Sequence, residues 1–323
     1  MTKSSDRDEL LGDVAEMYYQ EGKTQSEISN TIGVTRSAIS RMLTEARQKG
    51  IVEIHVHRPL QYQPDIQEKL IEKFNLQSAS VIKWSGSDDY KNLRHKLGQA
   101  AAYALNERIK SDIIIGVAWG TTVQATIEAF DERKLTNTRV VQLTGVLGST
   151  RHPYSGQTLV ESLASKLNGE GIYLNTPFMV EKEDTAKILM NDQSVREAIS
   201  LARQCDIALL GVGSTKPEYF SLLKGQHITQ AEFTRLLEAQ AVGDVSGHYF
   251  DISGNLVDVD FHKRLVGITK DDLLNIPIRL AVAGNAEKAE AILGAVCGGF
   301  INNLVTDHIT AARVLEIAKT HCD

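Results

Sequence analysis

The sequence has few cysteines and no long apolar run, and each shortage excludes a class of protein. Its three cysteines, Cys205, Cys297 and Cys322, show neither metal-ligand spacing nor the pairing of a disulfide framework, which is typical of a reducing cytoplasm. No apolar stretch approaches the roughly 20 residues of a membrane span, and no charged-then-apolar leader opens the chain. We therefore expect a cytoplasmic protein that binds no membrane, no metal and no cofactor.

Length and a proline-bearing stretch predict two domains. The chain has 323 residues, enough for a small domain and a second, larger one, each with its own core. The stretch RPLQYQP, residues 58–64, places two prolines between a strand pattern and a helical pattern. We therefore predict one domain of residues 1–58 and another of residues 59–323.

Residues 24–41, TQSEISNTIGVTRSAISR, have the pattern of two helices joined by a tight turn. The first helical face stops at Gly33, because glycine most easily adopts the left-handed conformation of a sharp turn. Thr35 is then placed to cap a second helix. The apolar stripe of that helix consists of Ile39, Met42, Leu43 and Ala46. This is the pattern of a helix-turn-helix, whose second helix enters the DNA major groove.

Two flanking patterns complete a small domain. An amphipathic helix precedes the pair, with an apolar face formed by Leu11, Val14, Ala15, Tyr18 and Tyr19. After Gly50 the period changes to alternation, with Val52, Ile54 and Val56 on one side. That alternation predicts a strand, and we interpret it as the wing of a winged helix-turn-helix.

Side chains off the apolar stripe are candidates for DNA contact: Thr24, Gln25, Thr35, Arg36, Ser37, Ser40 and Arg41. Residues 35–50 carry four cations against Glu45 alone, but acidic residues before them leave the whole segment nearly neutral. Specific binding would then depend on base contacts and on more than one recognition helix per site. The alternative is an ordinary helical hairpin whose arginines only face water.

From residue 80 onward, short β-rich runs alternate with helical segments. This alternation predicts a parallel sheet covered on both faces, an α/β, Rossmann-like domain. The predicted strands are residues 79–82, 113–117, 140–143, 207–210, 278–282 and 303–306. In open sheets of this kind, ligands bind at the carboxyl ends of the strands.

Three loops of small residues follow predicted strands and together could bind a phosphate. Their candidate contacts are Gly120, Thr121, Thr122, Gly211, Gly213, Gly284, Asn285, Ala286 and Lys288. Backbone N–H groups at a helix N-terminus, hydroxyls and one ammonium are suitable ligands for an anion. Taken singly, each loop is also explained by ordinary turn geometry.

Two further segments offer polar contacts. The loop TGVLGSTRHPYS, residues 144–155, contributes Thr144, Gly145, Arg151 and Ser155, which would bind substrate or merely face water. In residues 241–254, Asp244 lies among glycines and small residues before a short strand. A carboxylate there could accept two sugar hydroxyls, and the alternative is that it caps a turn.

The motifs occur in an order that resembles one family across essentially the whole chain. After the helix-turn-helix come WGTT at 119–122, QLTG at 142–145, GVGS at 211–214, AVGD then YFD at 241–251, AVAGNAEKAEAI at 281–292 and LVTD at 304–307. The set resembles the SorC family of bacterial sugar-responsive transcriptional regulators, of the SorC/DeoR type. The resemblance implies a winged helix-turn-helix joined to an effector domain related in fold to sugar-phosphate isomerases and deaminases.

The resemblance also implies function. Members are typically homotetramers that bind double-stranded operator DNA under the control of a phosphorylated sugar. It implies phosphate contacts at Thr121, Thr122 and the loop 284–288, and a hydroxyl acceptor at Asp244. Thr144 departs from the lysine or arginine of some relatives; threonine has no amine for an imine, so a covalent effector is disfavoured, and a monophosphate is favoured over a bisphosphate unless Arg151 compensates.

Three classes of function remain. The first is a non-enzymatic regulator of a carbohydrate-utilisation operon, which we favour. The second is a sugar-phosphate isomerase or deaminase with a DNA-binding appendage, for which Asp244, His248 and Lys288 are candidate acid–base groups by type. The third, a constitutive architectural DNA binder, is disfavoured by the near-neutral DNA-binding segment and by the size of the second domain.

Overall fold

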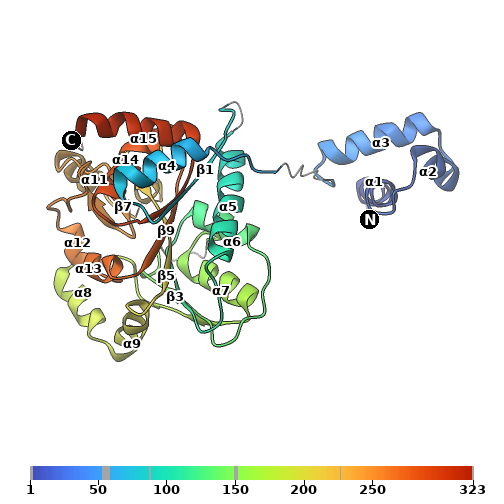
Figure 1. Ribbon diagram of the computed structural model, residues 1–323. Coiled ribbons are helices and arrows are strands. Elements are labelled where there is room, and N and C mark those ends of the chain that lie inside the picture. The colour runs from blue at the N-terminus through green and yellow to red at the C-terminus, as the bar shows by residue number, and fades with distance from the viewer. Residues whose placement is uncertain (1–2, 53–58, 87–88, 149–151, 226, 322–323) are drawn as a thin grey trace. The chain divides into compact units, whose positions relative to one another are not determined.

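The computed structural model describes residues 3–52, 59–86, 89–148, 152–225 and 227–321 (Figure 1). The chain divides into two compact units, Met1–Pro59 and Leu60–Asp323. Within the described ranges, no helix is both long enough and apolar enough to cross a bilayer.

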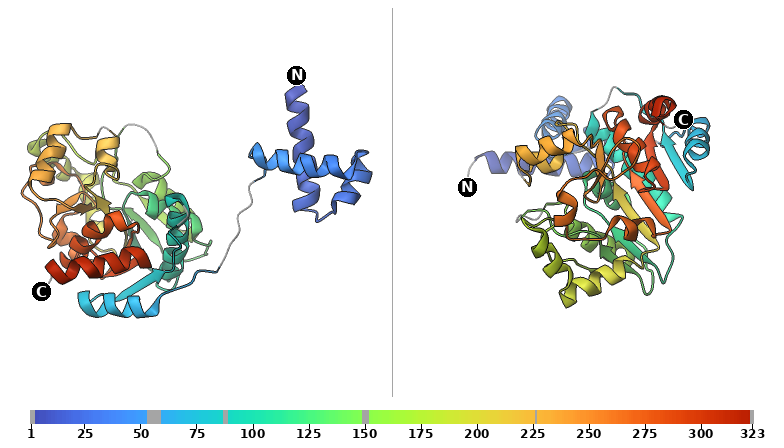
Figure 2. Two further views of the ribbon diagram at one scale, coloured as in Figure 1. Left: turned by 90° about the horizontal axis from the view of Figure 1, so that it is seen from above. Right: turned by 90° about the vertical axis from the view of Figure 1, so that its left-hand side faces the viewer.

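The first unit is a bundle of α1 (Lys3–Tyr19), α2 (Gln25–Ile32) and α3 (Arg36–Gln48), in which α3 crosses α1 (Figure 2). Its core consists of Leu11, Val14, Ala15, Ile28, Ile39, Met42, Leu43 and Ala46. The predicted stripe was wrong at Tyr19, which is 39% exposed because α1 ends there. The expected wing strand lies mostly in residues 53–58, outside the described residues.

The second unit is built on a seven-stranded, wholly parallel sheet. In spatial order its strands are β1 (Ser78–Ile82), β10 (Asn303–Asp307), β9 (Ile278–Val282), β5 (Ile207–Gly211), β2 (Ile114–Val117), β3 (Arg139–Gln142) and β4 (Glu170–Ile172). All six predicted strands are confirmed. The pattern missed β4, a three-residue edge strand with glycine at its centre, too short for an alternation to register.

Helices cover both faces of the sheet (Figure 1). One layer consists of α5 (Tyr90–Asn106), α6 (Thr121–Ala129) and α7 (Gly156–Leu167). The opposite layer consists of α4 (Pro64–Phe74), α9 (Gln193–Ala202), α14 (Ala289–Cys297) and α15 (His308–His321), and α8 (Glu183–Met190) precedes α9. Successive residues of β2 pack against opposite layers. Ile114 packs in the core beneath α4, α9, α14 and α15, and Ile115 packs in the core beneath α5, α6 and α7.

The segment between β5 and β9 forms a separate apolar cluster at the carboxyl edge of the sheet. It contains a small antiparallel sheet of β6 (Gly213–Ser214), β7 (Gly243–Val245) and β8 (His248–Phe250). Four short helices accompany that sheet: α10 (Ser221–Lys224), α11 (Gln230–Glu238), α12 (Phe261–Arg264) and α13 (Lys270–Leu274). Because β6 follows β5 almost directly, this cluster stands over the edge at which ligands bind in such folds.

Candidate functional site

The turn between α2 and α3 has the geometry that the sequence predicts. Gly33 has φ +77° and ends α2 in the left-handed region, while its N–H donates to the Ser29 carbonyl. Thr35 caps α3 by accepting a hydrogen bond from the Ala38 N–H at 3.2 Å. Both local predictions are confirmed.

The candidate DNA contacts fall into two groups. The hydroxyls of Thr24 and Thr35 bind backbone N–H groups at the helix starts, and Thr24 forms a reciprocal capping box with Glu27. Gln25 is partly exposed. The side chains of Arg36, Ser37, Ser40 and Arg41 are exposed along α3. Two further cations of this unit are bound to acids, Lys49 to Asp8 and Arg7 to Glu45, each at 2.7 Å. The side chains of Arg36, Ser37, Ser40 and Arg41 are exposed to solvent and therefore accessible to DNA.

In the second unit, the first loop of small residues opens α6. Gly120 is the N-cap residue of α6, with φ +145°. Because glycine has no side chain, it does not cap the free N–H groups of the first helical turn. Thr121 begins α6, and Thr122 is buried. A Cβ added to Gly211 would lie 3.6 Å from the Thr122 Oγ1 atom, which places the ends of β2 and β5 side by side.

The loop after β5 meets Asp244 directly. Gly213 of β6 pairs with Asp244 of β7, and a Cβ on Gly213 would lie 2.0 Å from the Asp244 Oδ1 atom. Only glycine fits at that position. The buried Asp244 carboxylate accepts a hydrogen bond from the Gly247 N–H at 3.0 Å. Burial raises the pKa of Asp244 to about 6, against the opposing effects of the Gly247 bond and the Lys288 charge.

Lys288 joins the same group from the loop after β9. Its ammonium Nζ donates to the Val212 carbonyl at 2.9 Å. Burial lowers the pKa of Lys288, and the nearby Asp244 carboxylate acts in the opposite direction. The sequence predicts Lys288 as part of a loop of small residues. Lys288 ends a 3₁₀ turn, Ala286–Lys288, because Asn285 caps that turn before α14 begins.

The loop after β9 is hydrogen-bonded to an acid, Asp307, that the sequence analysis did not single out. Asp307, the last residue of β10, is buried and accepts hydrogen bonds from the Asn285 N–H at 3.1 Å and from the Thr310 hydroxyl at 2.6 Å. A Cβ on Gly284 would lie 2.6 Å from its Oδ2 atom. The available signal was an acid between a strand and a helix, the position of an N-cap.

The remaining candidates lie at the end of β3. Thr144 is buried and its backbone pairs with Gly267, while the Gly145 N–H donates to the Val266 carbonyl at 2.9 Å. Ser155 caps α7. The Gly120 N–H donates to the Tyr154 carbonyl at 3.1 Å, which brings this loop beside the β2 end. Arg151 lies outside the described residues.

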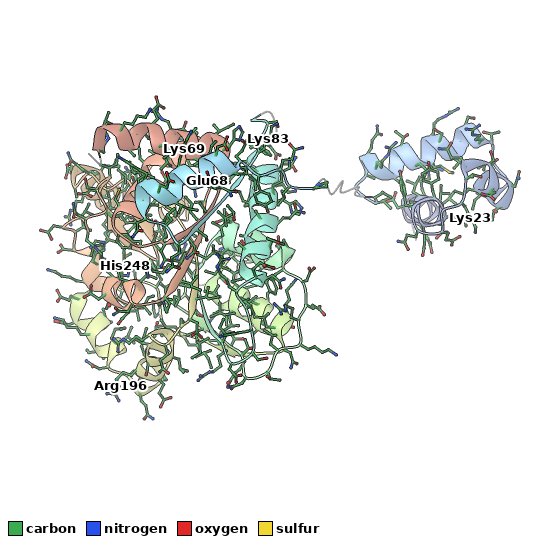
Figure 3. The ribbon with its side chains drawn as sticks, viewed as in Figure 1. Lys23, Glu68, Lys69, Lys83, Arg196 and His248 are labelled. Carbon is green, nitrogen blue, oxygen red and sulfur yellow. The ribbon has the colours of Figure 1, made fainter. Side chains whose placement is uncertain are left out.

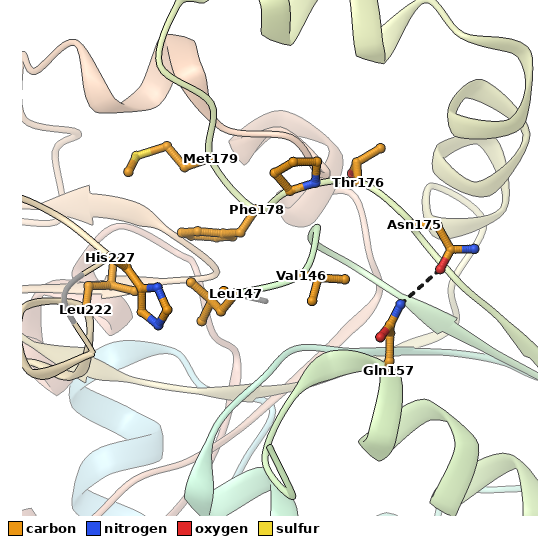
Figure 4. A pocket seen from close by; sticks show the side chains of 11 residues that line it. Val146, Leu147, Gln157, Asn175, Thr176, Phe178, Met179, Leu222 and His227 are labelled. Atoms are coloured by element: carbon orange, nitrogen blue, oxygen red, sulfur yellow. Dashed lines mark hydrogen bonds between the residues drawn. The ribbon is translucent and has the colours of Figure 1, made fainter. Parts of the chain in front are cut away.

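A cavity of about 570 Å³ lies beside these loops (Figure 4). Its walls come from Val146–Gly148, from the start of α7 at Gln157, from Asn175–Met179, and from Leu222 and His227. None of these residues belongs to the predicted contact set. They lie on four segments far apart in the sequence, so no spacing rule could have grouped them.

Comparison with known proteins decides the family. Residues 59–316 match the family model described as "Putative sugar-binding domain". The chain is 30% identical over 312 residues to the deoxyribonucleoside regulator of Bacillus subtilis (strain 168), covering 96% of this chain and 98% of that protein. It is also 30% identical over 312 residues to the transcriptional regulator LsrR of Escherichia coli (strain K12), covering 96% and 95%. The full-length sorbitol operon regulator SorC of Klebsiella pneumoniae superposes with a TM-score of 0.72 at 27% identity, covering 96% of this chain and 99% of that one.

The chain belongs to the SorC family of sugar-binding transcriptional regulators.

This SorC-family chain is therefore a sugar-responsive regulator of an operon, and the α/β fold inferred from the motifs is confirmed. The relatives named above are transcriptional regulators. The edge described here, formed by the loops after β2, β5 and β9 and by Asp244 of β7, which pairs with Gly213, belongs to the matched sugar-binding domain.

Proposed function

We propose that the regulator binds double-stranded operator DNA of a carbohydrate-utilisation operon through α3 and responds to a phosphorylated sugar at the carboxyl edge of the sheet. The exposed Arg36, Ser37, Ser40 and Arg41 would reach base edges or phosphates in the major groove, while Thr24, Gln25 and Thr35 would contact the backbone from the helix starts. Operator DNA lies in the cytoplasm of a bacterium, so the proposal also places the protein there.

The observation that carries the effector proposal is the unused hydrogen-bonding capacity of the buried Asp244 carboxylate and of the partly exposed Lys288 ammonium near it. Within the described part of the chain, the Lys288 ammonium makes one hydrogen bond, although it has three donors. Asp244 accepts one, although a carboxylate has about four acceptor sites. A phosphate on Lys288 and the uncapped N-terminus of α6 at Thr121 and Thr122, with two sugar hydroxyls on Asp244, would use that capacity.

The predicted contacts at Thr144, Gly145 and Ser155 would position the rest of the sugar. Thr144 has no amine, so the effector would bind without a covalent bond. Among the described residues named here, Lys288 is the one cation beside Asp244, which supports a monophosphate.

Control of DNA binding would arise from a population shift. An effector changes operator affinity only by its differential affinity for two arrangements of the protein. In a homotetramer, the typical state of this family, those arrangements would differ in the spacing of the recognition helices. The proposal covers both an activator and a repressor, because the same coupling between the two sites can either strengthen or weaken operator binding.

The proposal is tested by fluorescence anisotropy of a labelled fragment from upstream of the protein's own operon. The protein is titrated at fixed salt, with and without a panel of sugar monophosphates, because phosphate contacts make the affinity depend on salt. We expect tight binding that changes with one sugar phosphate. Indifference to the whole panel would discard the phosphorylated effector, and no binding would discard this operator and favour the enzyme alternative.

Two substitutions separate the two sites. Arg41→Ala is expected to weaken operator binding about tenfold or more and to leave effector affinity unchanged. The matched control is Arg196→Ala, which removes an exposed arginine of α9 in the other unit (Figure 3). Asp244→Ala is expected to abolish the effector response and to spare operator binding. An equal loss of effector affinity in Arg41→Ala would contradict this division.

The enzyme alternative rests on Asp244 and Lys288. Burial raises the pKa of Asp244 and lowers the pKa of Lys288, so both values move toward neutral pH. His248, the third candidate by residue type, is buried and its Nε2 is hydrogen-bonded to the Ile268 carbonyl at 3.0 Å, so that ring nitrogen is already occupied. We propose that the protein is not an enzyme. Turnover of a sugar phosphate that is abolished in Asp244→Asn would overturn this.

A further inference from the structure

The backbone at Asn285 has a conformation that side chains rarely adopt. Its φ is +89° and its ψ is 121°, outside the left-handed helical region. Among the described residues, six others that are not glycine have positive φ, and all six lie between 50° and 62°. Glycine adopts the conformation of Asn285 readily, whereas a residue with a Cβ atom is strained there. The surrounding structure must therefore hold Asn285 in place.

An acid at the end of the neighbouring strand holds this residue. Asp307 ends β10, which pairs with β9, and its side chain is buried. The Asn285 N–H donates to the Asp307 Oδ2 atom at 3.1 Å. A Cβ on Gly284 would lie 2.6 Å from that same oxygen and 2.6 Å from the Leu97 Cδ1 atom. The loop can approach the carboxylate because residue 284 is glycine.

The conformation of Asn285 sets the position of Lys288. The Asn285 Oδ1 atom accepts from the Glu287 N–H at 3.2 Å, and the Asn285 carbonyl accepts from the Lys288 N–H at 2.8 Å. These two bonds form the 3₁₀ turn Ala286–Lys288. At its end, the Lys288 Nζ atom donates to the Val212 carbonyl in the loop after β5. A relaxed Asn285 would turn the chain differently and move the ammonium away from that loop.

Helix capping alone does not account for the contacts of Asp307. Its Oδ1 atom accepts from the Thr310 N–H at 2.9 Å, the bond of an N-cap at the start of α15. Its Oδ2 atom accepts from the Thr310 hydroxyl at 2.6 Å and also from the Asn285 N–H. Because a cap needs one oxygen, the second oxygen is available to the loop. The carboxylate therefore ties the loop after β9 to α15.

We propose that Asp307 is a positioning residue of the sugar-binding domain. Its Oδ2 atom holds Asn285 in the strained conformation, and that conformation places the Lys288 ammonium where the effector phosphate binds. For ligand affinity this inference rests on the proposed function, whereas for the conformation of the loop it does not.

Asp307→Asn separates the two roles of the side chain. Asparagine caps a helix about as well as aspartate does, so its single oxygen can keep the bond to the Thr310 N–H. Its amide nitrogen then faces the Asn285 N–H, which places one donor against another. In the full chain, hydrogen exchange followed by mass spectrometry is expected to show residues 284–288 exchanging about tenfold faster, the loss of one good hydrogen bond.

Thr310→Val is the matched control. It removes the hydroxyl bond to the same buried carboxylate and keeps the bond from the Asn285 N–H. It is expected to lower the thermal midpoint, because a buried hydrogen bond is lost, and to leave exchange at residues 284–288 unchanged. Faster exchange in both variants, or in neither, would overturn the inference.

Ligand affinity is measured by isothermal titration calorimetry with glucose 6-phosphate, ribose 5-phosphate and sorbitol 6-phosphate as probes. For a probe that binds the unaltered protein, Asp307→Asn is expected to weaken binding about tenfold and Thr310→Val to leave it unchanged. Unchanged affinity in Asp307→Asn, despite faster exchange, would overturn the positioning of Lys288 and leave the proposed function intact.

Asn285→Gly tests the cause of the effect, because glycine adopts φ +89° without strain. In that background the loop depends less on Asp307, so Asp307→Asn is expected to weaken probe binding by only about threefold or less. A purely structural role of Asp307 predicts the same loss in both backgrounds, and that result would overturn the inference.

Two remaining outcomes are also decisive. If Asp307→Asn does not fold, Asn285→Gly is compared with Asn285→Ala; both lack the bond to the Glu287 N–H, and alanine alone keeps the strain. The glycine variant is expected to have the higher thermal midpoint, and equal midpoints would overturn the inference. If no probe binds the unaltered protein, the phosphorylated effector of the proposed function is discarded, and exchange at residues 284–288 decides the role of Asp307.

Discussion

Asp244 and Lys288 are opposite charges at one edge of the sheet, the acid buried and the lysine partly buried. Each is disfavoured in its charged form by burial, and each partly restores the charge of the other. A buried pair of this kind adds little stability, because the desolvation of two ions offsets their attraction. The placement of both groups at this edge is therefore better explained by ligand binding than by folding.

The raised pKa of Asp244 has a consequence for stability. Its pKa is about 6 in the folded chain, against roughly 3.9 in an unfolded one. The folded state holds this proton more tightly, so the stabilisation is complete below about pH 4 and is lost as pH rises through about 6. Relative to Asp244→Asn, the unaltered protein should lose on the order of 3 kcal/mol of unfolding free energy across that window.

Urea unfolding at a series of pH values measures this difference. Tryptophan fluorescence reports the second unit specifically, because Trp84 and Trp119 are the two tryptophans of the chain. Histidines such as His262, whose pKa burial lowers to about 4, titrate in both proteins and cancel in the comparison. If the free energy of unfolding of the two proteins changed with pH in parallel, the pKa of Asp244 would not be raised in the folded state.

At the scale of elements, local capping accounts for where the helices begin and end. Thr24, Thr35 and Ser155 each accept a backbone N–H at the first turn of a helix, and Gly33 ends α2 in the left-handed region. These are short-range interactions, so the turn and caps at Gly33 and Thr35 could be predicted from neighbouring residues. The edge strand β4 could not, because three partly exposed residues carry no period.

Two glycines in the first unit predict opposite effects for the same substitution. A Cβ at either Gly12 or Gly33 would meet no atom within 4 Å, so packing does not distinguish them. Gly12 lies inside α1, where alanine should stabilise by about 0.5–1 kcal/mol. Gly33 has φ +77°, where alanine should destabilise by roughly 1–2 kcal/mol.

Thermal unfolding of a fragment of residues 1–59, followed by far-ultraviolet circular dichroism, compares the two variants with the unaltered fragment. The opposite signs make each variant a control for the other. If both substitutions shifted the thermal midpoint in the same direction, backbone conformation would not explain their effects on stability.

At the scale of the whole molecule, the chain divides between Pro59 and Leu60. The exposed side chains of α3 all lie before that point, and the groups at the sheet edge all lie after it. A domain with its own core folds independently of its neighbour. The two proposed binding activities should therefore be separable by cutting the chain.

A fragment of residues 60–323 is expected to bind the effector sugar phosphate with the affinity of the full chain and not to bind the operator. Calorimetry measures the first property and anisotropy the second. Operator affinity in the fragment would refute the assignment of DNA binding to α3. Effector affinity lost on removal of residues 1–59 would show that the first unit contributes to the sugar site.

The sequence by itself determined the helix cap at Thr35, the turn at Gly33, six of the seven strands of the large sheet and the family, because each depends on residues close together in the chain or on an ordered set of motifs. Only the tertiary structure decided that Gly213 faces Asp244, that Lys288 binds the Val212 carbonyl, that Asp307 holds the loop at Asn285, and that separate segments of the chain line one cavity. The physical reason is that strand order and loop packing are non-local: a side chain's spacing predicts the face it occupies, whereas its partner depends on which strand the sheet places beside it.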